Sequence, residues 1–191
     1  MLSQECVGFW IRLLTCVFCC SWLDFGTPGK SNYFGLVPAE ANYVAPGKKP
    51  LSSMSPMMVF RNNDSGATDG KKLALVVGGS GGPKIISAVL QVILSVCLVG
   101  MSLFDAVAKP RIHEQLLYHD AAITTTEKSQ VSGGLWIDVS NRTRQALLRR
   151  GHDTLVDIDY AGTVQAVSID LETNKLSAMS DIRKGGTPAG Y

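Results

Sequence analysis

Two pairs of neighbouring residues have the types needed to act on a substrate with an anionic centre. The first pair, Gly81 and Gly82, stands immediately before an uncharged run at 85–99. Consecutive glycines can turn two backbone N–H groups toward one point, with the positive end of a helix behind them. Such donors stabilise the oxyanion that develops in acyl transfer. A phosphate-binding turn or a plain strand-to-helix turn would use the same residues.

The second pair, Ser52 and Ser53, lies between Pro50 and Pro56. Rigid flanking residues reduce the entropy lost when two hydroxyl donors are presented to a ligand, as recognition of a carboxylate requires. Taken alone, the two residues are better interpreted as ordinary loop serines.

The run at 85–99 predicts a helix that is buried on most sides, because both of its faces are nearly apolar. One face has apolar residues at the 3/4 spacing of a helix. They are Ile86, Val89, Leu90, Ile93, Leu94 and Cys97. Pro83 suits the first helical position, where its missing N–H would be unpaired in any case.

The pattern of apolar runs and turn residues predicts further elements. They are antiparallel strands at 57–60 and 73–77, helices at 102–108 and 141–150, and a hairpin at 164–169 and 176–179. Ser102 and Ser140 are predicted to cap the two helices. No strand is predicted between 109 and 140.

Composition limits the class of protein. The chain has 191 residues, of which 46% are hydrophobic and 18% charged, and its formal net charge is +2. A chain of this length buries about 70% of its surface on folding. A nucleic-acid-binding protein would show a stronger and clustered basic excess, so no nucleic-acid partner is predicted.

Residues 6–23 differ from the rest because they are almost wholly apolar. Cys16 and Cys19 have C-x-x-C spacing, but no His or second Cys pair follows at zinc-site distance, so no metal site is predicted. The length of the segment suits a secretory signal or a membrane anchor, whereas Glu5 and Arg12 oppose both. A buried helix and sequence recruited from outside the domain are the open alternatives.

Four motifs together resemble the γ-glutamyltranspeptidase family. They are PLSSMSP at 50–56, VVGGSGGPKII at 76–86, PRIHEQ at 110–115 and SDIRKGGTPAGY at 180–191. Their order and spacing are similar to those of the small, C-terminal subunit of that family. We therefore divide the chain into the apolar segment 1–23 and a small-subunit-like domain at 24–191.

The resemblance implies an α+β fold, a partial αββα sandwich of the N-terminal-nucleophile hydrolase type. It implies a γ-glutamyltransferase or glutathione hydrolase, in which a threonine hydroxyl attacks the γ-glutamyl amide of glutathione. The acyl group then passes to water, an amino acid or a peptide, and no cofactor is implied. Gly81 and Gly82 would form the oxyanion hole, and Ser52 and Ser53 would hold the substrate α-carboxylate.

The family motif M-D-D-F aligns with residues 22–25, which read WLDF. Asp24 takes the position that binds the substrate α-ammonium, and Leu23 replaces the first aspartate. The nucleophile of the family opens a T-x-H-x-S-V-like segment, which the surroundings of Thr15 do not match, and no other threonine precedes Asp24. We expect the nucleophile segment to be encoded elsewhere or lost, a large-subunit portion or companion chain to be the partner, and the chain by itself to be inactive.

Two interpretations therefore remain open. The chain is one portion of a γ-glutamyltransferase, or it is a non-catalytic truncated paralogue that binds a partner or γ-glutamyl compounds and is tethered by residues 6–23. Either interpretation favours the plasma membrane or the secretory pathway as its location. The three histidines, His113, His119 and His152, are interpreted as structural or exposed.

Overall fold

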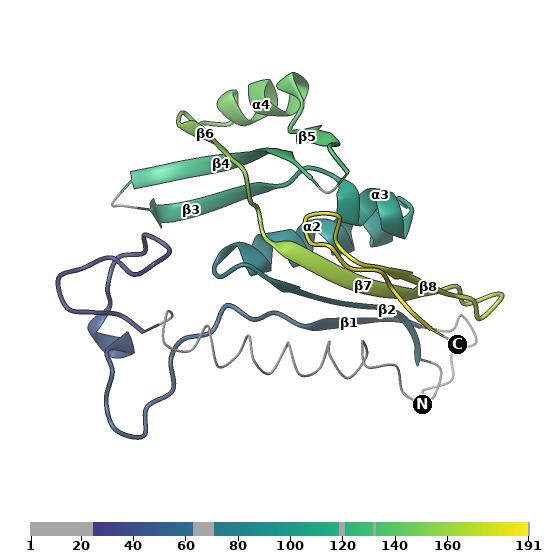
Figure 1. Cartoon of the computed structure of the whole chain (residues 1–191), viewed down its shortest axis with the longest axis horizontal. Coiled ribbons are helices and arrows are strands. Elements are labelled where there is room, and N and C mark those ends of the chain that lie inside the picture. The colour runs from purple at the N-terminus through teal and green to yellow at the C-terminus, as the bar shows by residue number, and fades with distance from the viewer. Residues whose placement is uncertain (1–24, 63–70, 119–120, 132, 191) are drawn as a thin grey trace.

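A computed structural model describes residues 25–62, 71–118, 121–131 and 133–190, so segment 1–23 and Asp24 lie outside the described residues. Its strands form two sheets, with helix α2 between them (Figure 1). The elements are η1 (Glu40–Asn42), β1 (Met57–Asn62), β2 (Lys71–Ser80), α2 (Lys84–Cys97), α3 (Leu103–Ala108), β3 (Ile112–Tyr118), β4 (Ala121–Gln130), β5 (Trp136–Asp138), α4 (Asn141–Leu148), β6 (Leu155–Ile158), β7 (Thr163–Ile169) and β8 (Leu176–Met179).

The first sheet is antiparallel, in the order β1-β2-β7-β8. This confirms the predicted strand pair at 57–60 and 73–77 and the predicted hairpin. The predicted caps of α3 and α4 are also confirmed, because Ser102 Oγ accepts the Asp105 N–H at 3.1 Å and Ser140 Oγ accepts the Thr143 N–H at 3.2 Å. Side-chain capping satisfies backbone donors that the first helical turn leaves unpaired.

One face of this sheet packs on α2 and α3 and forms the core. Leu75 and Val77 of β2, and Val164 and Ala166 of β7, alternate along their strands and are at most 4% exposed. The helices contribute the remaining buried side chains of this core, which are Ile85, Ala88, Val89, Val92, Ala106 and Val107. Alternation therefore places one apolar face of the sheet under the helices.

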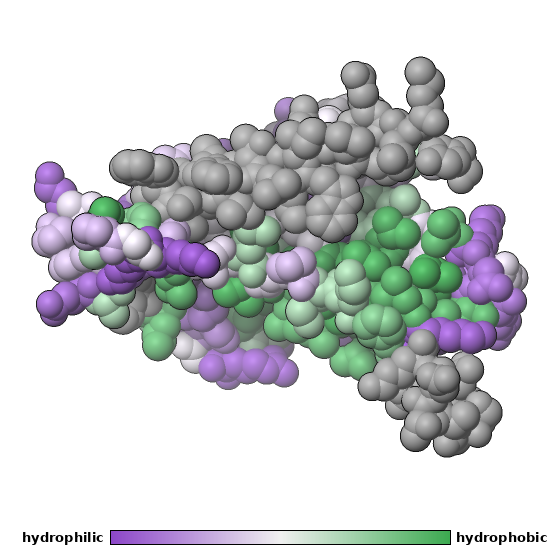
Figure 2. Space-filling model, turned by 90° about the horizontal axis from the view of Figure 1, so that it is seen from below, coloured by the Kyte–Doolittle hydropathy of each residue, from purple (hydrophilic) through white to green (hydrophobic). Residues whose placement is uncertain are grey.

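The opposite face of the first sheet is also apolar, and within the described ranges no helix covers it. Met58, Val76, Val167 and Ala178 stand opposite one another across the four strands, and opposed residues share a face. Met58 is 63% exposed and Val167 is 37% exposed. The view of the molecule from below shows apolar side chains gathered over this sheet (Figure 2). The described residues thus form one sheet-and-helix half of a sandwich, with a sheet face left without a second sheet.

A second sheet contains β3, β4 and β5, with β6 parallel to β4. It lies against the far side of α2, where β3 contacts the helix. The sequence pattern predicted no strand between 109 and 140, and this prediction was wrong. Strand β4 reads AAITTTEKSQ, and its buried residues Thr124, Thr125, Thr126 and Glu127 are consecutive and polar, so they show no apolar alternation.

The prediction that the helix at 85–99 is buried on most sides was wrong in part. Ile86, Leu90 and Leu94, which belong to the apolar face singled out by their spacing, are 54%, 51% and 40% exposed. The buried positions are instead Ile85, Ala88, Val89, Val92 and Ser95. A helix with two apolar faces gives no signal from periodicity alone about which face is covered.

A buried ionic network fastens the C-terminal segment to the core. Arg111 Nη2 lies 2.7 Å from Asp181 Oδ2, and Arg183 Nη2 lies 2.6 Å from Glu127 Oε2. Arg183 Nη1 also donates to Asp181 Oδ1 at 3.0 Å, which joins the two pairs into one network. All four side chains are at most 3% exposed. Burial alone would raise the pKa of Asp181, but the two guanidinium groups hold that pKa below its usual value.

We predict that Asp181→Asn destabilises the fold by about 3–5 kcal/mol, because it leaves Arg111 with a buried and uncompensated charge. Asp138→Asn is the matched control, since Asp138 pairs with Arg144 at the surface with 48% of its side chain exposed, and should cost less than about 1 kcal/mol. Urea denaturation followed by circular dichroism measures both. Equal losses in the two variants would contradict the importance of the network.

The same network predicts an acid limb of stability. Because the folded-state pKa of Asp181 lies below the unfolded value of 3.8, its contribution is present above that pH and is lost as the pH falls through the folded pKa. The stability of Asp181→Asn should therefore fall less steeply than that of the wild type in this range.

Candidate functional site

The segment that carries the two serines runs between η1 and β1. Its start is fastened to η1, because the Leu51 N–H donates to Asn42 Oδ1 at 3.0 Å. Ser52 is exposed, and its Oγ accepts the Met54 N–H at 3.2 Å. A hydroxyl that accepts through its oxygen still has its proton to donate. Ser53 is half-buried, and its carbonyl accepts a hydrogen bond from Ser55 Oγ at 3.1 Å.

Gly81 and Gly82 form the turn between β2 and α2, as predicted, with φ angles of 137° and 62°. Both lie in the region that side-chain-bearing residues rarely adopt. A Cβ on Gly82 would meet the Phe34 ring at 2.3 Å, and one on Gly81 would meet the Gly162 Cα at 2.7 Å. Among the described residues, neither glycine N–H donates a hydrogen bond. Both amides therefore lack an internal acceptor at the start of a helix.

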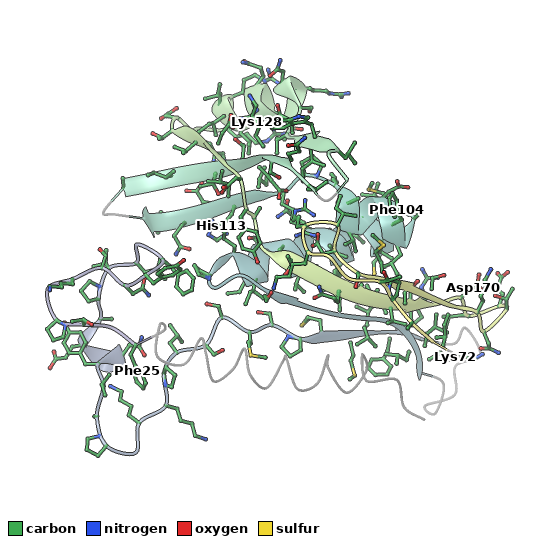
Figure 3. All side chains as sticks on the ribbon, viewed as in Figure 1. Phe25, Lys72, Phe104, His113, Lys128 and Asp170 are labelled. Carbon is green, nitrogen blue, oxygen red and sulfur yellow. The ribbon has the colours of Figure 1, made fainter. Side chains whose placement is uncertain are left out.

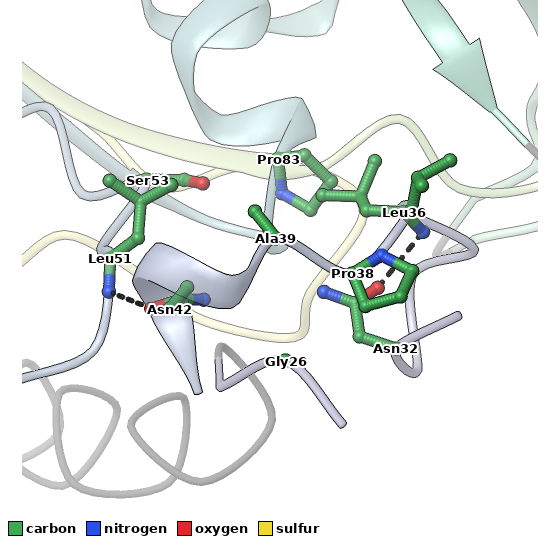
Figure 4. Close-up of a pocket in the computed structure, with 10 residues that line it drawn as sticks. Gly26, Asn32, Leu36, Pro38, Ala39, Asn42, Leu51, Ser53 and Pro83 are labelled. Atoms are coloured by element: carbon green, nitrogen blue, oxygen red, sulfur yellow. Dashed lines mark hydrogen bonds between the residues drawn. The ribbon is translucent and has the colours of Figure 1, made fainter. Parts of the chain in front are cut away.

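One pocket brings the two regions together. Ser53 and Pro83, the residue that follows Gly82, both line it (Figure 4). The rest of its wall comes from the loop before β1 and consists of Gly26, Asn32, Leu36, Val37, Pro38, Ala39, Asn42 and Leu51. Its volume is about 110 Å³. Pockets that enclose small ligands are usually about 300–1,000 Å³, so this pocket is smaller than a typical ligand site.

Ser52, Gly81 and Gly82 do not line this pocket, although Ser52 and Gly82 each adjoin a residue that does. Asp24 lies outside the described residues, so its predicted position beside the serines stays a prediction. No group of three or more His, Cys, Asp or Glu side chains within the described ranges is arranged to hold a metal ion.

Side chains from distant parts of the chain make hydrogen bonds to Ser80 in the GGSGG turn. These residues were not predicted from the sequence to belong to the site. Lys184 Nζ donates to Ser80 Oγ at 3.0 Å, and Tyr160 OH donates to the Ser80 carbonyl at 3.3 Å. Thr163 Oγ1 lies 2.7 Å from Ser80 Oγ. Lys184 belongs to the terminal motif SDIRKGGTPAGY, so that motif was the one available signal.

Lys84, the first residue of α2, supplies a positive charge beside the turn. Its Nζ donates to the Tyr160 carbonyl at 3.0 Å. Burial lowers the pKa of Lys84, and the carboxylates of Asp159 and Glu127 partly offset that effect. A cation and two unpaired amides at one helix start are suited to stabilising an anionic centre.

The sheet-and-helix half-sandwich has the α+β fold of the N-terminal-nucleophile hydrolase type, which the superposed solved structures share. The chain belongs to the gamma-glutamyltranspeptidase family, whose model matches residues 20–191. The predicted α+β class and the family resemblance are thereby confirmed.

Individual relatives agree with this assignment. The chain is 35% identical over 171 residues to glutathione hydrolase proenzyme 1 of Schizosaccharomyces pombe, covering 88% of this chain and 24% of that protein. The gamma-glutamyltranspeptidase of Helicobacter pylori superposes with a TM-score of 0.67 at 33% identity, covering 86% of this chain and 80% of that one. That of Pseudomonas nitroreducens, complexed with L-DON, gives 0.69 at 31% identity, covering 90% and 79%. The chain thus spans about a quarter of the length of the curated relatives that it matches.

We predict that Gly82→Ala destabilises the protein by at least about 1–2 kcal/mol, because alanine is strained at the φ of 62° and its Cβ would overlap the Phe34 ring. Gly78→Ala is the matched control, since nothing lies within 4 Å of a Cβ added there, and should change stability by less than about 0.5 kcal/mol. Thermal unfolding measures both. A neutral Gly82→Ala would contradict the described turn.

Proposed function

We propose that this chain is the small-subunit portion of a γ-glutamyltransferase (glutathione hydrolase) and that it binds the γ-glutamyl group of glutathione. The observation that carries the proposal is the shared pocket of Ser53 and Pro83, beside two glycine amides that have no acceptor among the described residues. In this proposal the hydroxyls of Ser52 and Ser53 donate to the substrate α-carboxylate, and the carboxylate of Asp24 binds its α-ammonium.

The glycine pair acts on the reacting carbonyl. When the threonine hydroxyl of the companion portion attacks the γ-glutamyl carbonyl carbon, a C–O bond forms and the carbonyl oxygen becomes an oxyanion. The N–H groups of Gly81 and Gly82 donate to that oxygen, with the cation of Lys84 nearby. When the tetrahedral intermediate collapses, the C–N bond breaks and the leaving amine takes the proton that the hydroxyl released. Loss of one such donor typically lowers the rate by about 10²–10³-fold.

We place the protein at the plasma membrane or in the secretory pathway. Support comes from the family and from the apolar composition of residues 6–23. In the described part of the chain, no helix has the length and hydrophobicity needed to traverse a bilayer.

We predict that Ser53→Ala weakens glutathione binding about 10–100-fold, because a hydrogen bond to a carboxylate contributes about 1.5–3 kcal/mol. Ser177→Ala on β8 is the matched control, since Ser177 is an exposed serine outside the pocket, and it should bind like the wild type. Amide chemical-shift changes of the full chain during a glutathione titration give both affinities. Equal affinity in the two variants, or no binding by the wild type, would refute the substrate site.

Hydrolysis of γ-glutamyl-p-nitroanilide separates the catalytic proposal from a purely binding role. We expect no turnover by the chain alone. Turnover should appear on co-expression with a companion portion, taken from the part of a related glutathione hydrolase proenzyme that precedes the matched region. Glutathione binding without turnover by any such pair would favour the non-catalytic alternative.

We further propose that the companion large-subunit portion covers the exposed face of the first sheet. The apolar row Met58, Val76, Val167 and Ala178 supports this, because a sandwich places a second sheet against such a face. The share of each relative's length that this chain does not span is large enough to contain that sheet.

Val167→Glu should therefore abolish assembly with the companion portion, because it places a charge inside a sheet-to-sheet interface. Leu98→Glu is the matched control, since Leu98 is 78% exposed but lies at the end of α2, away from this sheet face. Co-purification of the two portions measures assembly. Retained assembly in Val167→Glu would exclude this face as the interface.

A further inference from the structure

The chain contains two acceptor sequences for N-linked glycosylation, and neither the proposed catalytic chemistry nor the substrate site uses them. The acceptor sequence is an asparagine, then any residue except proline, then a serine or threonine. This pattern occurs at 63–65 and at 141–143. Residues 63–65 lie outside the described residues, whereas Asn141, Arg142 and Thr143 form the first turn of α4.

Asn141 is exposed, and its side chain makes no hydrogen bond with any residue that the structure describes. It is the first residue of α4, and side chains on a helix lean toward the helix N-terminus. A side chain at this position has no preceding turn to pack on, so it extends past the end of the helix. The amide of Asn141 can therefore carry a bulky group without the loss of a contact in the fold.

Other residues hold the start of α4 in place. Ser140 Oγ accepts the Thr143 N–H at 3.2 Å, and it lies 3.0 Å from Thr143 Oγ1. Arg144 joins the same turn to β5, because its Nη2 donates to Asp138 Oδ1 at 2.7 Å. A glycan on Asn141 would thus leave the contacts that position α4 intact.

Helix α4 lies far from the surfaces that the proposed function uses. In Figure 3, Lys128 on β4 lies beside α4 at the top of the view, whereas Lys72 on β2 lies near the bottom. The exposed face of the first sheet is on the lower side of the molecule (Figures 1 and 2). No residue of α4 lines the pocket that contains Ser53. A glycan on α4 would therefore obstruct neither the pocket nor the sheet face.

We propose that Asn141 is the acceptor of an N-linked glycan. The inference rests on the part of the proposed function that places the protein in the secretory pathway, where such glycans are added. In the reaction, the amide nitrogen of Asn141 attacks the anomeric carbon of a lipid-pyrophosphate-linked oligosaccharide. A C–N bond forms, the C–O bond to the pyrophosphate breaks and its electron pair leaves with the pyrophosphate, and the nitrogen gives up one proton to the transferase.

The experiment expresses the full chain in cultured eukaryotic cells and treats it with a glycosidase that converts glycosylated asparagine to aspartate. Peptide mass spectrometry should find aspartate at position 141 only after this treatment. Asn63→Gln removes the other acceptor sequence, so that the electrophoretic shift on deglycosylation then reports position 141 alone. Addition of Asn141→Gln should abolish that shift, and a shift that persists would overturn the assignment to Asn141.

Two changes at Thr143 test the acceptor sequence without altering Asn141. Thr143→Ser keeps the hydroxyl that the sequence requires and should keep the glycan. Thr143→Val has nearly the same shape but no hydroxyl, and it should lose the glycan. A glycan on Asn141 in Thr143→Val would overturn the proposal.

A second form of the full chain, with a cleavable secretory signal added before Met1, separates the acceptor site from the location. An unmodified Asn141 in this secreted form would overturn the acceptor site. A glycan that appears in this form alone would refute the secretory location, and with it the modification of the natural chain. Glutathione affinity tests the substrate site independently: a chain that carries the glycan but does not bind glutathione would refute that site and support this inference.

Discussion

Four buried charged side chains set the geometry on which the rest of this structure depends. Arg111, Glu127, Asp181 and Arg183 come from three distant parts of the chain and are together almost completely withdrawn from solvent. Each buried charge costs several kcal/mol of desolvation, which is offset only when all partners and their hydrogen bonds are present. The C-terminal segment, which carries Asp181 and Arg183, therefore cannot leave without removing the ionic partners of Arg111 and Glu127 in the core.

This network is connected to the candidate site by hydrogen bonds to the backbone. Arg111 Nη1 donates to the Gly162 carbonyl at 2.7 Å, and Asp181 Oδ2 accepts the Val164 N–H at 2.7 Å. Both contacts fix the chain at the start of β7, and Gly162, the residue just before that strand, lies against Gly81. The amide directions at the glycine turn thus depend on the far end of the chain, which explains how a terminal motif can be as specific a family signal as the site residues themselves.

Local signals in the sequence predicted local structure well and contacts between distant residues poorly. Ser102 and Ser140 marked their helices because capping involves only the next few residues. Strand β4 was not predicted because its residues Thr124 to Glu127 are polar although they are buried. Their burial depends on hydrogen bonds with other strands and with arginines, such as the 2.8 Å bond from Thr126 Oγ1 to Asp157 Oδ1. The importance of Ser53 and of the glycine turn came from the family resemblance, since spacing alone could not show that Ser53 and Pro83, with 29 residues between them, line one pocket.

On the proposed function, the small pocket and the exposed sheet face are both explained by the companion portion, and both bear on catalysis. Oxyanion stabilisation by amides depends on excluding water, because bulk solvent weakens every electrostatic interaction at the site. A pocket of about 110 Å³ is too small to enclose a γ-glutamyl group and exclude water from it by itself. In the proposed complex, the companion portion that covers Val167 also completes the pocket and brings the nucleophile. On that proposal assembly and catalysis are one event, and the glycine pair gains its full effect only when the apolar row is covered.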